Sequence, residues 1–272
     1  MAHRSSAAAA EVADAVDRLE FVVTAHNAAA TIGDCLRSLL ALPRTWRVTV
    51  IIDASTDETA AAIAKFADPR LRTITVNYRS RAKASNLGFH RAEAEIVCSV
   101  DSDVRYVTDR FDDLIRQLGR FPLLMLTEDP ADAVARPVEL GPSFLSPRNT
   151  FIYSRRLLPG LAFAEIYPRT AGEDTDLAIR LLKAGVALGA TYGGYEHHRT
   201  EGPMGLRRRL HFHTWNLITY LRHLDVPMCR QRLAVIARHP LQRTTASLRQ
   251  EYGDRDRRWP WQRSKHHKIT FR

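Results

Sequence analysis

Residues 96–103 read Ile-Val-Cys-Ser-Val-Asp-Ser-Asp, an apolar run that ends in two carboxylates separated by one residue. The run Ile96–Val100 has the length and composition of a buried strand. Because successive side chains of a strand point to opposite faces, Asp101 and Asp103 should point to the same side beyond its carboxyl end. Oxygen ligands in that position suit Mg²⁺ or Mn²⁺. The stretch therefore predicts a cation site at a strand end, with a solvated turn as the alternative.

Outward from this stretch, apolar strands alternate with helical segments. Such alternation predicts an α/β fold with a mostly parallel central sheet flanked by helices, whose ligands bind beyond the carboxyl ends of the strands. A basic helical C-terminal extension follows the sheet. The expected strands are Leu19–Val23, Val48–Ile52, Leu71–Val76 and Ile96–Val100, and the expected helices begin at a Thr31 cap, span Asp57–Phe66 and Lys83–Ala94, and begin again near Thr175.

The net charge of +10 is concentrated in one part of the chain. Residues 1–200 carry a net charge of −1, whereas residues 201–272 carry +11. A basic segment of this kind favours an anionic partner. We therefore divide the chain into a flexible leader (1–17), an α/β domain (18–200) with two halves (18–104 and 105–200), and a basic helical extension (201–272).

Composition narrows the class of protein further. No apolar run approaches the roughly 18 residues needed to cross a bilayer, and the first ten residues lack the apolar segment of a signal peptide. We expect a cytoplasmic protein, with peripheral attachment at the inner face of the membrane as an option. Three widely spaced cysteines, Cys35, Cys98 and Cys229, favour buried thiols over a disulfide or zinc framework.

Polar residues follow each expected strand and should converge on one crevice. Neither Gly-x-Gly-x-x-Gly nor Gly-x-x-x-x-Gly-Lys occurs after any strand, which removes the main support for a dinucleotide site or a phosphate loop. If the ligand carries a diphosphate, a metal and basic side chains would then have to bind it. The polar groups are Thr24–Asn27, Asp53–Asp57, Asn77 with Arg79 and Arg81, and Asp101–Asp103.

In their order and spacing these residues resemble the family 2 glycosyltransferases, inverting enzymes with the glycosyltransferase A-type fold. The resemblance spreads over about 180 residues. It implies that residues 18–200 form the catalytic domain, with a nucleotide-sugar-binding half (18–104) and an acceptor-binding half (105–200). It implies transfer of a sugar from a nucleotide diphosphate sugar, with Mn²⁺ or Mg²⁺ as cofactor. The matching blocks are Phe21–Asn27, Ile51–Asp57, Lys83–Gly88, Val100–Asp103 and Gly172–Arg180.

The resemblance implies roles for these positions. Asp103 would bind the metal that bridges to the diphosphate, Asp101 would contact ribose and metal, and Asp53 would accept a hydrogen bond from the base, for which uracil N3–H is a suitable donor. Nearby cations would stabilise the leaving diphosphate, unless they are solvated charges of an exposed loop. The nucleotide-sugar-binding candidates are Thr24, Ala25, Asn27, Asp53, Arg79, Arg81, Lys83, Asn86, Asp101 and Ser102.

Glu173 and Asp174 stand at the start of an expected helix, where the family places its catalytic base. An inverting transfer needs a carboxylate that takes the proton of the acceptor hydroxyl. The resemblance implies Asp174 as the base, with Glu173 orienting its neighbours. The alternative is that both merely complement the helix dipole. His197 and His198 are further candidate metal ligands, and at most one of them should face the metal.

Two departures from the family pattern limit what it implies. Ile52-Asp53-Ala54-Ser55 replaces Asp-Asp-Gly-Ser, and His26 replaces a tyrosine in the first motif. Loss of the tyrosine ring changes the stacking on the base, which weakens the case for uridine as the nucleoside. The Gln-x-x-Arg-Trp element of processive members is absent, so transfer of a single sugar is favoured over polymerisation.

The residues that would bind the acceptor are harder to identify from the sequence. The proline-rich stretch from Thr127 to Arg169 should shape the acceptor pocket, with Asn149, Thr150 and Tyr153 as candidate lining residues. In the stretch Leu206–Leu221, leucines at 206, 210, 217 and 221 form one side of an amphipathic helix, which either packs on the body or lies on an anionic membrane. The basic tail could also hold a phosphate-bearing acceptor or a second subunit of a homo-oligomer.

The sequence thus predicts a metal-dependent, inverting glycosyltransferase that moves a hexosyl or N-acetylhexosaminyl group from a UDP-sugar to a hydroxyl acceptor. A sugar nucleotidyltransferase on a similar sheet is one alternative, disfavoured by the missing glycine-rich loop. A non-catalytic nucleic-acid-binding protein acting through the tail is another. Carboxylates at the strand ends would repel a phosphate backbone, so we expect no nucleic acid partner.

Overall fold

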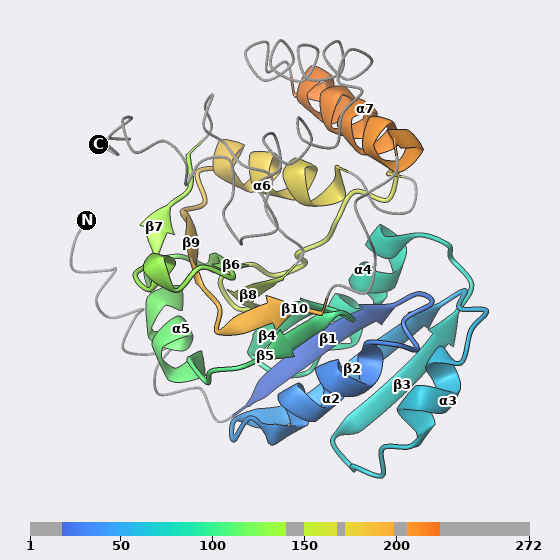
Figure 1. Cartoon of the computed structure of the whole chain (residues 1–272). Coiled ribbons are helices and arrows are strands. Elements are labelled where there is room, and N and C mark those ends of the chain that lie inside the picture. Colours follow the sequence, from blue (N-terminus) through green and yellow to red (C-terminus); the bar gives the residue numbers. More distant parts are fainter. Residues whose placement is uncertain (1–17, 140–149, 168–171, 199–205, 224–272) are drawn as a thin grey trace.

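The computed structural model describes residues 18–139, 150–167, 172–198 and 206–223, and Figure 1 shows their arrangement. An eight-stranded sheet in the order β3-β2-β1-β4-β8-β6-β9-β7 forms the centre. Its strands are β1 (Leu19–Ala25), β2 (Thr45–Asp53), β3 (Leu71–Val76), β4 (Ile96–Asp101), β6 (Leu123–Thr127), β7 (Arg136–Pro137), β8 (Phe151–Ser154) and β9 (Leu188–Tyr192). The fold is the predicted α/β class.

The first half of the sheet is parallel and the second half is mixed. Strands β3, β2, β1 and β4 run parallel, whereas β8 lies antiparallel between β4 and β6. Strand β6 therefore points the same way as β4, and β9 pairs with it in parallel. The carboxyl ends of β1, β2, β4 and β6 consequently meet at one edge of the sheet.

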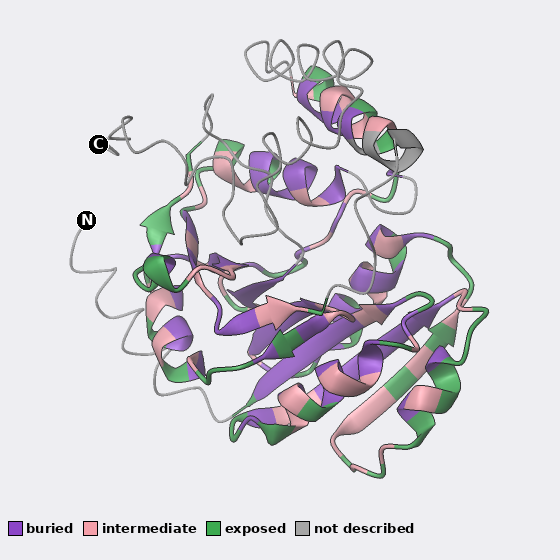
Figure 2. Ribbon diagram, in the orientation of Figure 1, coloured by how far each residue is buried: buried purple, intermediate pink, exposed green. Residues whose placement is uncertain are grey.

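Helices cover both faces of the sheet, as Figures 1 and 2 show. Alternate residues of β4 separate into two cores: Ile96, Cys98 and Val100 pack on the side of α2 (Ile32–Ala41), α3 (Thr59–Ala64) and α5 (Phe111–Leu118). Val97 packs on the opposite side, with α4 (Arg81–Arg91), α6 (Glu173–Lys183) and α7 (Leu206–Arg222). This burial on both faces explains why the strand reads as a continuous apolar run.

A small antiparallel ribbon joins two distant parts of the chain. Strand β5 (Val104–Tyr106) pairs with β10 (Tyr195–His197), so that His197 lies opposite Val104. The short 3₁₀ helix Pro130–Asp132 lies between β6 and β7. The ribbon thus carries a histidine back to the end of β4.

Several local expectations need adjustment. Thr31 occupies the N-cap position of α2, but its side chain makes no capping hydrogen bond and its hydroxyl instead points to the carbonyl of Ala28. Helix α4 begins at Arg81, capped by Ser80, and not at Lys83. Cys35 and Cys98 are buried free thiols as predicted. The leader 1–17, Asn149, Cys229 and the tail 224–272 lie outside the described residues.

The last described helix differs most from expectation. Its predicted leucine side is not the buried one: Leu210 and Leu217 are half-buried, and Leu221 is 56% exposed. The face of α7 with the least exposure carries His213, Asn216, Thr219 and Tyr220. Among the described helices, none is long and apolar enough to cross a bilayer.

Candidate active site

The end of β4 carries the cluster that the sequence predicted. Asp101, Asp103 and His197 place one potential ligand atom each within 4.8 Å of one another. Asp101 lies beside Thr24 of β1 in the sheet register, and the N–H of His198 donates to the carbonyl of Asp103 at 2.6 Å. Two carboxylates and an imidazole form a donor set that suits Mn²⁺ or Mg²⁺.

The two histidines have different surroundings. The Nδ1 atom of His197 lies 2.8 Å from Oε1 of Glu128, which also accepts the backbone N–H of His197 at 2.8 Å. With a proton on Nδ1, the ligand atom of His197 would be Nε2, the usual arrangement of a metal-bound histidine. His198 instead faces Asp34, with 3.2 Å between Nδ1 and Oδ2. His197 is therefore the member of the pair that faces the carboxylates.

Glu128 was missed by the sequence analysis. It directly follows β6, so it shares the signal that identified the other polar groups at strand ends. Its strand, the apolar run Leu123–Thr127, was not among those predicted.

Arg81 connects the two acidic centres of the site. Its guanidinium forms an ion pair with Asp101, and both side chains are mostly buried, at 17% and 20% exposure. Burial lowers the pKa of Arg81, while the carboxylates of Glu173, Asp174 and Asp103 act in the opposite direction. Arg81 thus lies within electrostatic reach of both the strand end and the start of α6, as a candidate for stabilising a diphosphate.

The other two predicted cations are exposed. Arg79 adopts φ +51° in the loop before α4, and Lys83 lies on the outer side of that helix. The structure describes no hydrogen bond or ion pair of the Lys83 side chain. Only Arg81 of the three is enclosed by the described residues of the site.

Asp53 has a structural role that the sequence did not reveal. Its Oδ1 accepts the N–H groups of Tyr78 and Arg79 at 2.7 and 2.8 Å, and its Oδ2 accepts that of Ser80 at 2.8 Å. The side chain is buried, so this carboxylate holds the loop that leads into α4. The direct hydrogen bond that a base would donate to Asp53 stays a prediction, and it would have to use the remaining lone pair of Oδ2.

The loops after β1 and β2 are tied to each other. Asn27, at φ +50°, accepts the N–H of Thr56 at 2.8 Å through its side chain and donates its own N–H to Ser55 at 3.1 Å. Ala25 is buried at the end of β1, and Thr24 is half-buried. His26 places Nδ1 2.7 Å from the carbonyl of Asp53. These contacts leave the two loops side by side at the sheet edge.

Two candidate site residues make structural contacts that the sequence did not reveal. The amide of Asn86 is occupied by the chain before α6: it donates to the carbonyl of Phe163 and accepts its N–H, at 3.0 and 2.8 Å. It therefore fixes that segment, and a contact of Asn86 with a nucleotide stays a prediction. Tyr153 is a buried core residue packed on Phe89, and not an exposed acceptor contact. Thr150 is fully buried, and Ser102 is half-buried beside the carboxylates.

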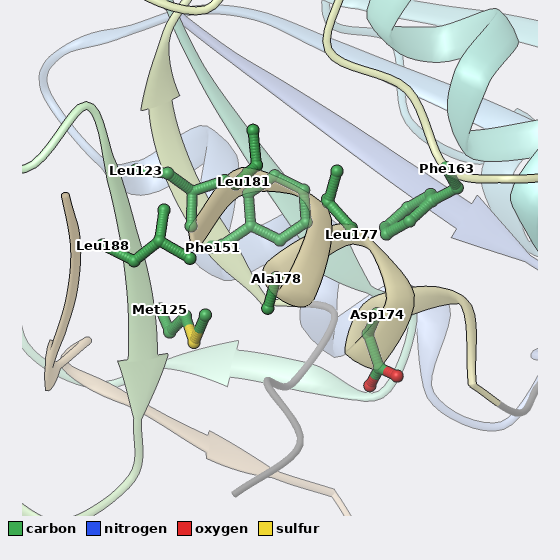
Figure 3. A pocket seen from close by; sticks show the side chains of 9 residues that line it. All are labelled: Leu123, Met125, Phe151, Phe163, Asp174, Leu177, Ala178, Leu181 and Leu188. Atoms are coloured by element: carbon green, nitrogen blue, oxygen red, sulfur yellow. The ribbon is translucent and has the colours of Figure 1, made fainter. Parts of the chain in front are cut away.

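The second acidic centre begins α6. Glu173 is buried, whereas Asp174 is half-buried and its Oδ1 accepts the N–H of Thr175 at 2.7 Å. Asp174 lies at the end of a small apolar pocket between α6 and the sheet, and Figure 3 shows its carboxylate turned away from the apolar side chains. The pocket is lined by Leu123, Met125, Phe151, Phe163, Asp174, Leu177, Ala178, Leu181 and Leu188.

Cys35 lies beneath the strand end, with Sγ 3.8 Å from the carbonyl of Asp101. Burial raises the pKa of this thiol, and the charge of Asp103 adds to the shift. Both effects favour the protonated thiol, and Cys35 is not among the described residues whose ligand atoms converge at the strand end.

Comparison with known proteins agrees with this architecture. A model of the family "Glycosyl transferase family 2" matches residues 20–127. The succinoglycan biosynthesis protein ExoO of Rhizobium meliloti (strain 1021) is 36% identical over 106 residues, which cover 38% of this chain and 30% of that protein. The aligned part thus spans less than a third of the relative.

Solved structures share the fold at low sequence identity. S. aureus TarS 1-349 superposes with a TM-score of 0.55 at 19% identity, covering 86% of this chain and 74% of the other. A mycobacterial protein gives a TM-score of 0.58 at 19% identity, covering 79% and 78%. Residues 20–127 thus match glycosyl transferase family 2, and the described residues have a fold similar to that of these solved structures.

Proposed function

We propose that this protein is an inverting, metal-dependent glycosyltransferase that moves one sugar from a UDP-sugar to a hydroxyl acceptor. The observation that carries the proposal is the convergence of Asp101, Asp103 and His197, whose ligand atoms lie within 4.8 Å of one another. Arg81 links this cluster to Asp174, so a cation site and a candidate base flank one basic side chain.

The donor is proposed from two kinds of support. The ends of β1, β2 and β4 offer hydrogen-bonded loops and carboxylates, without a glycine-rich phosphate loop. The solved structures of TarS that share this fold include complexes with UDP and with UDP-GlcNAc. We therefore favour a UDP-sugar with a hexosyl or N-acetylhexosaminyl group.

The residues at the strand end fit a divalent cation. Asp103 and His197 would hold it, with Asp101 shared between the cation and Arg81. A bound Mn²⁺ or Mg²⁺ would supply positive charge to the diphosphate as it leaves. Glu128 would keep the imidazole of His197 in the orientation that presents Nε2.

Asp174 is the proposed general base. The acceptor oxygen forms a bond to the anomeric carbon, while the bond from that carbon to the diphosphate oxygen breaks on the opposite face. The acceptor proton passes to the carboxylate of Asp174, and the electron pair of the broken bond leaves with UDP. Arg81 would stabilise the negative charge that develops on the diphosphate. Transfer ends after one sugar, because the processive motif is absent.

The acceptor and its location are proposed only by class. The segment 201–272 carries a net charge of +11, which favours a phosphate-bearing acceptor or peripheral attachment to an anionic membrane. Residues 224–272 of this segment lie outside the described part of the chain.

Calorimetric titration of UDP, GDP and dTDP, with Mn²⁺ and then with excess chelator, tests the proposal. UDP should bind only with metal and more tightly than the other two nucleotides. NMR of the product of a UDP-sugar transfer should show the anomeric configuration opposite to that of the donor. Absence of binding to any of the three nucleotides, or retention of configuration, would contradict the proposal.

A further inference from the structure

Helix α7 presents a polar face to the rest of the protein. His213, Asn216, Thr219 and Tyr220 are each at most 2% exposed, and their spacing of three and four residues places them on one side of the helix. Burying polar groups is costly unless they are hydrogen-bonded. The partners of this face therefore indicate what α7 does, and Figure 1 shows that it lies against α6.

Asn216 reaches the residue that follows the proposed base. The hydroxyl of Thr175 lies 3.0 Å from Oδ1 of Asn216. The same hydroxyl lies 3.3 Å from Oδ1 of Asp174, and the N–H of Thr175 donates to that oxygen at 2.7 Å. Asn216 is thus one side chain removed from the carboxylate of Asp174.

Thr219 packs on Gly172, the residue before α6. Gly172 is the N-cap and has φ +93°, a conformation that L side chains rarely adopt. A Cβ atom there would lie 2.6 Å from Oγ1 of Thr219 and 2.9 Å from Tyr167. Oγ1 of Thr219 is also 3.0 Å from the hydroxyl of Tyr167. The backbone turn before Glu173 is therefore enclosed by α7.

The buried carboxylate of Asp176 completes the contact. Its Oδ1 lies 2.9 Å from Nε2 of His223 and accepts the hydroxyl of Tyr167 at 3.3 Å, while its Oδ2 accepts Nε of Arg180 at 2.7 Å. Burial raises the pKa of Tyr167, so its hydroxyl keeps the proton that it donates. Lys183 donates to the carbonyl of His223 at 2.6 Å, which fixes the end of α7 on α6.

We propose that α7 is a positioning element of the active site. Asn216, Thr219 and His223 fix residues 172–176, and through them the direction in which Asp174 points its carboxylate. This inference rests on the proposed role of Asp174 as the base. The contacts of α7 described above all lie in α6 and the segment before it, so loss of this face should impair turnover and leave binding of UDP and metal at the strand end intact.

A matched pair of substitutions tests the inference. Thr219→Val keeps the shape of the side chain and removes the hydroxyl, whereas Thr219→Ser keeps the hydroxyl. Displacing a catalytic group by about 1 Å can cost about a hundredfold in rate, so we expect kcat of Thr219→Val to fall about tenfold. Thr219→Ser should restore most of it. The donor KM and the Kd of UDP with Mn²⁺ should not change in either variant, and Asn216→Leu should behave like Thr219→Val.

A double-mutant cycle separates positioning from general damage. A residue that acts through Asp174 has no further effect once the carboxylate is gone, so Thr219→Val should not lower the residual rate of Asp174→Asn. Hydrogen exchange of the amides in residues 172–176 should be faster in Thr219→Val than in Thr219→Ser, a readout independent of activity.

Three outcomes would overturn the inference. One is wild-type kcat in both Thr219→Val and Asn216→Leu, and another is an equal loss in the Asp174→Asn background. The third is a wild-type protein that neither binds UDP nor transfers a sugar, which removes the proposed function and the inference with it. The titration of UDP identifies that third case before any variant of α7 is compared.

Discussion

The two acidic centres of the site are built in different ways. Asp101 and Asp103 end a strand that is paired on both sides, by β1 and β8, and buried on both faces. Glu173 and Asp174 begin a helix whose first turn depends on Gly172 and on contacts with α7. The strand end is thus fixed by the central sheet, and the helix start by the packing of one helix on another.

Because the two centres are built differently, binding of metal and nucleotide should be separable from turnover in this protein. Changes at the strand end should remove affinity for metal and nucleotide. Changes at the helix start should remove rate while affinity persists. Substitutions at the two centres test whether affinity and rate divide in this way.

Asp174→Asn should have the largest effect. Loss of a general base costs about a hundredfold to ten-thousandfold, and we expect kcat to fall about a thousandfold. The amide oxygen can still accept the N–H of Thr175, so the helix start should keep its structure. Steady-state kinetics and UDP titration should show the loss in kcat alone. Asp112→Asn, on the exposed side of α5, is the matched control and should leave both unchanged. Wild-type turnover in Asp174→Asn would remove the base assignment.

Asp103→Ala should affect affinity. The cluster loses one of its two carboxylates, and a metal contributes several kcal/mol at a leaving group, so we expect metal-dependent UDP binding to weaken by roughly a hundredfold. Titration of UDP with and without chelator measures the metal-dependent part of its affinity. If Asp103→Ala bound UDP and Mn²⁺ as the wild type does, the cation site at the strand end would be wrong.

Glu128→Gln tests the neighbour of His197. Groups that orient a metal-bound histidine typically contribute tenfold to a hundredfold in metal affinity, so we expect the Kd of Mn²⁺ to rise about tenfold. His198→Ala is the control, because that side chain faces Asp34. Electron paramagnetic resonance of free Mn²⁺ gives both values. A larger loss in His198→Ala than in Glu128→Gln would reverse the assignment of the two histidines.

Ala54→Gly should have the smallest effect, and on stability. Ala54 adopts φ +51° directly after Asp53, a conformation that costs an L residue about 1–2 kcal/mol. Glycine also has the greater entropy when unfolded, so we expect a net gain of about 0.5–1 kcal/mol in the free energy of unfolding. Denaturant unfolding measures it, with Ala84→Gly inside α4 as a control that should lose about 1 kcal/mol. A loss of stability in Ala54→Gly would show that the loop is held for another reason.

The sequence predicted the parallel half of the sheet because its strands are short apolar runs separated by recognisable helices. Strand β3 begins and ends at the predicted residues, and β4 differs by one. The polar groups at these strand ends were identified for the same reason. The α/β fold and the resemblance to glycosyl transferase family 2, which a family model matches over residues 20–127, followed from their order.

The features that the sequence left open or did not reveal depend on contacts between distant residues. The choice between His197 and His198 follows from the register of β10 on β5, which no local pattern encodes. Asn86 is occupied by Phe163, 77 positions away. The leucine pattern predicted the wrong buried face for α7, because hydrogen bonds to α6 decide which side is covered.

Crystals of the protein grown with UDP and Mn²⁺, measured at the manganese absorption edge, test the central claim most directly. We expect an anomalous peak within coordination distance of Asp103 and His197. The diphosphate should lie beside Arg81, and the carboxylate of Asp174 should face the position of the sugar. A manganese peak at His198, or a nucleotide bound away from the end of β4, would contradict it.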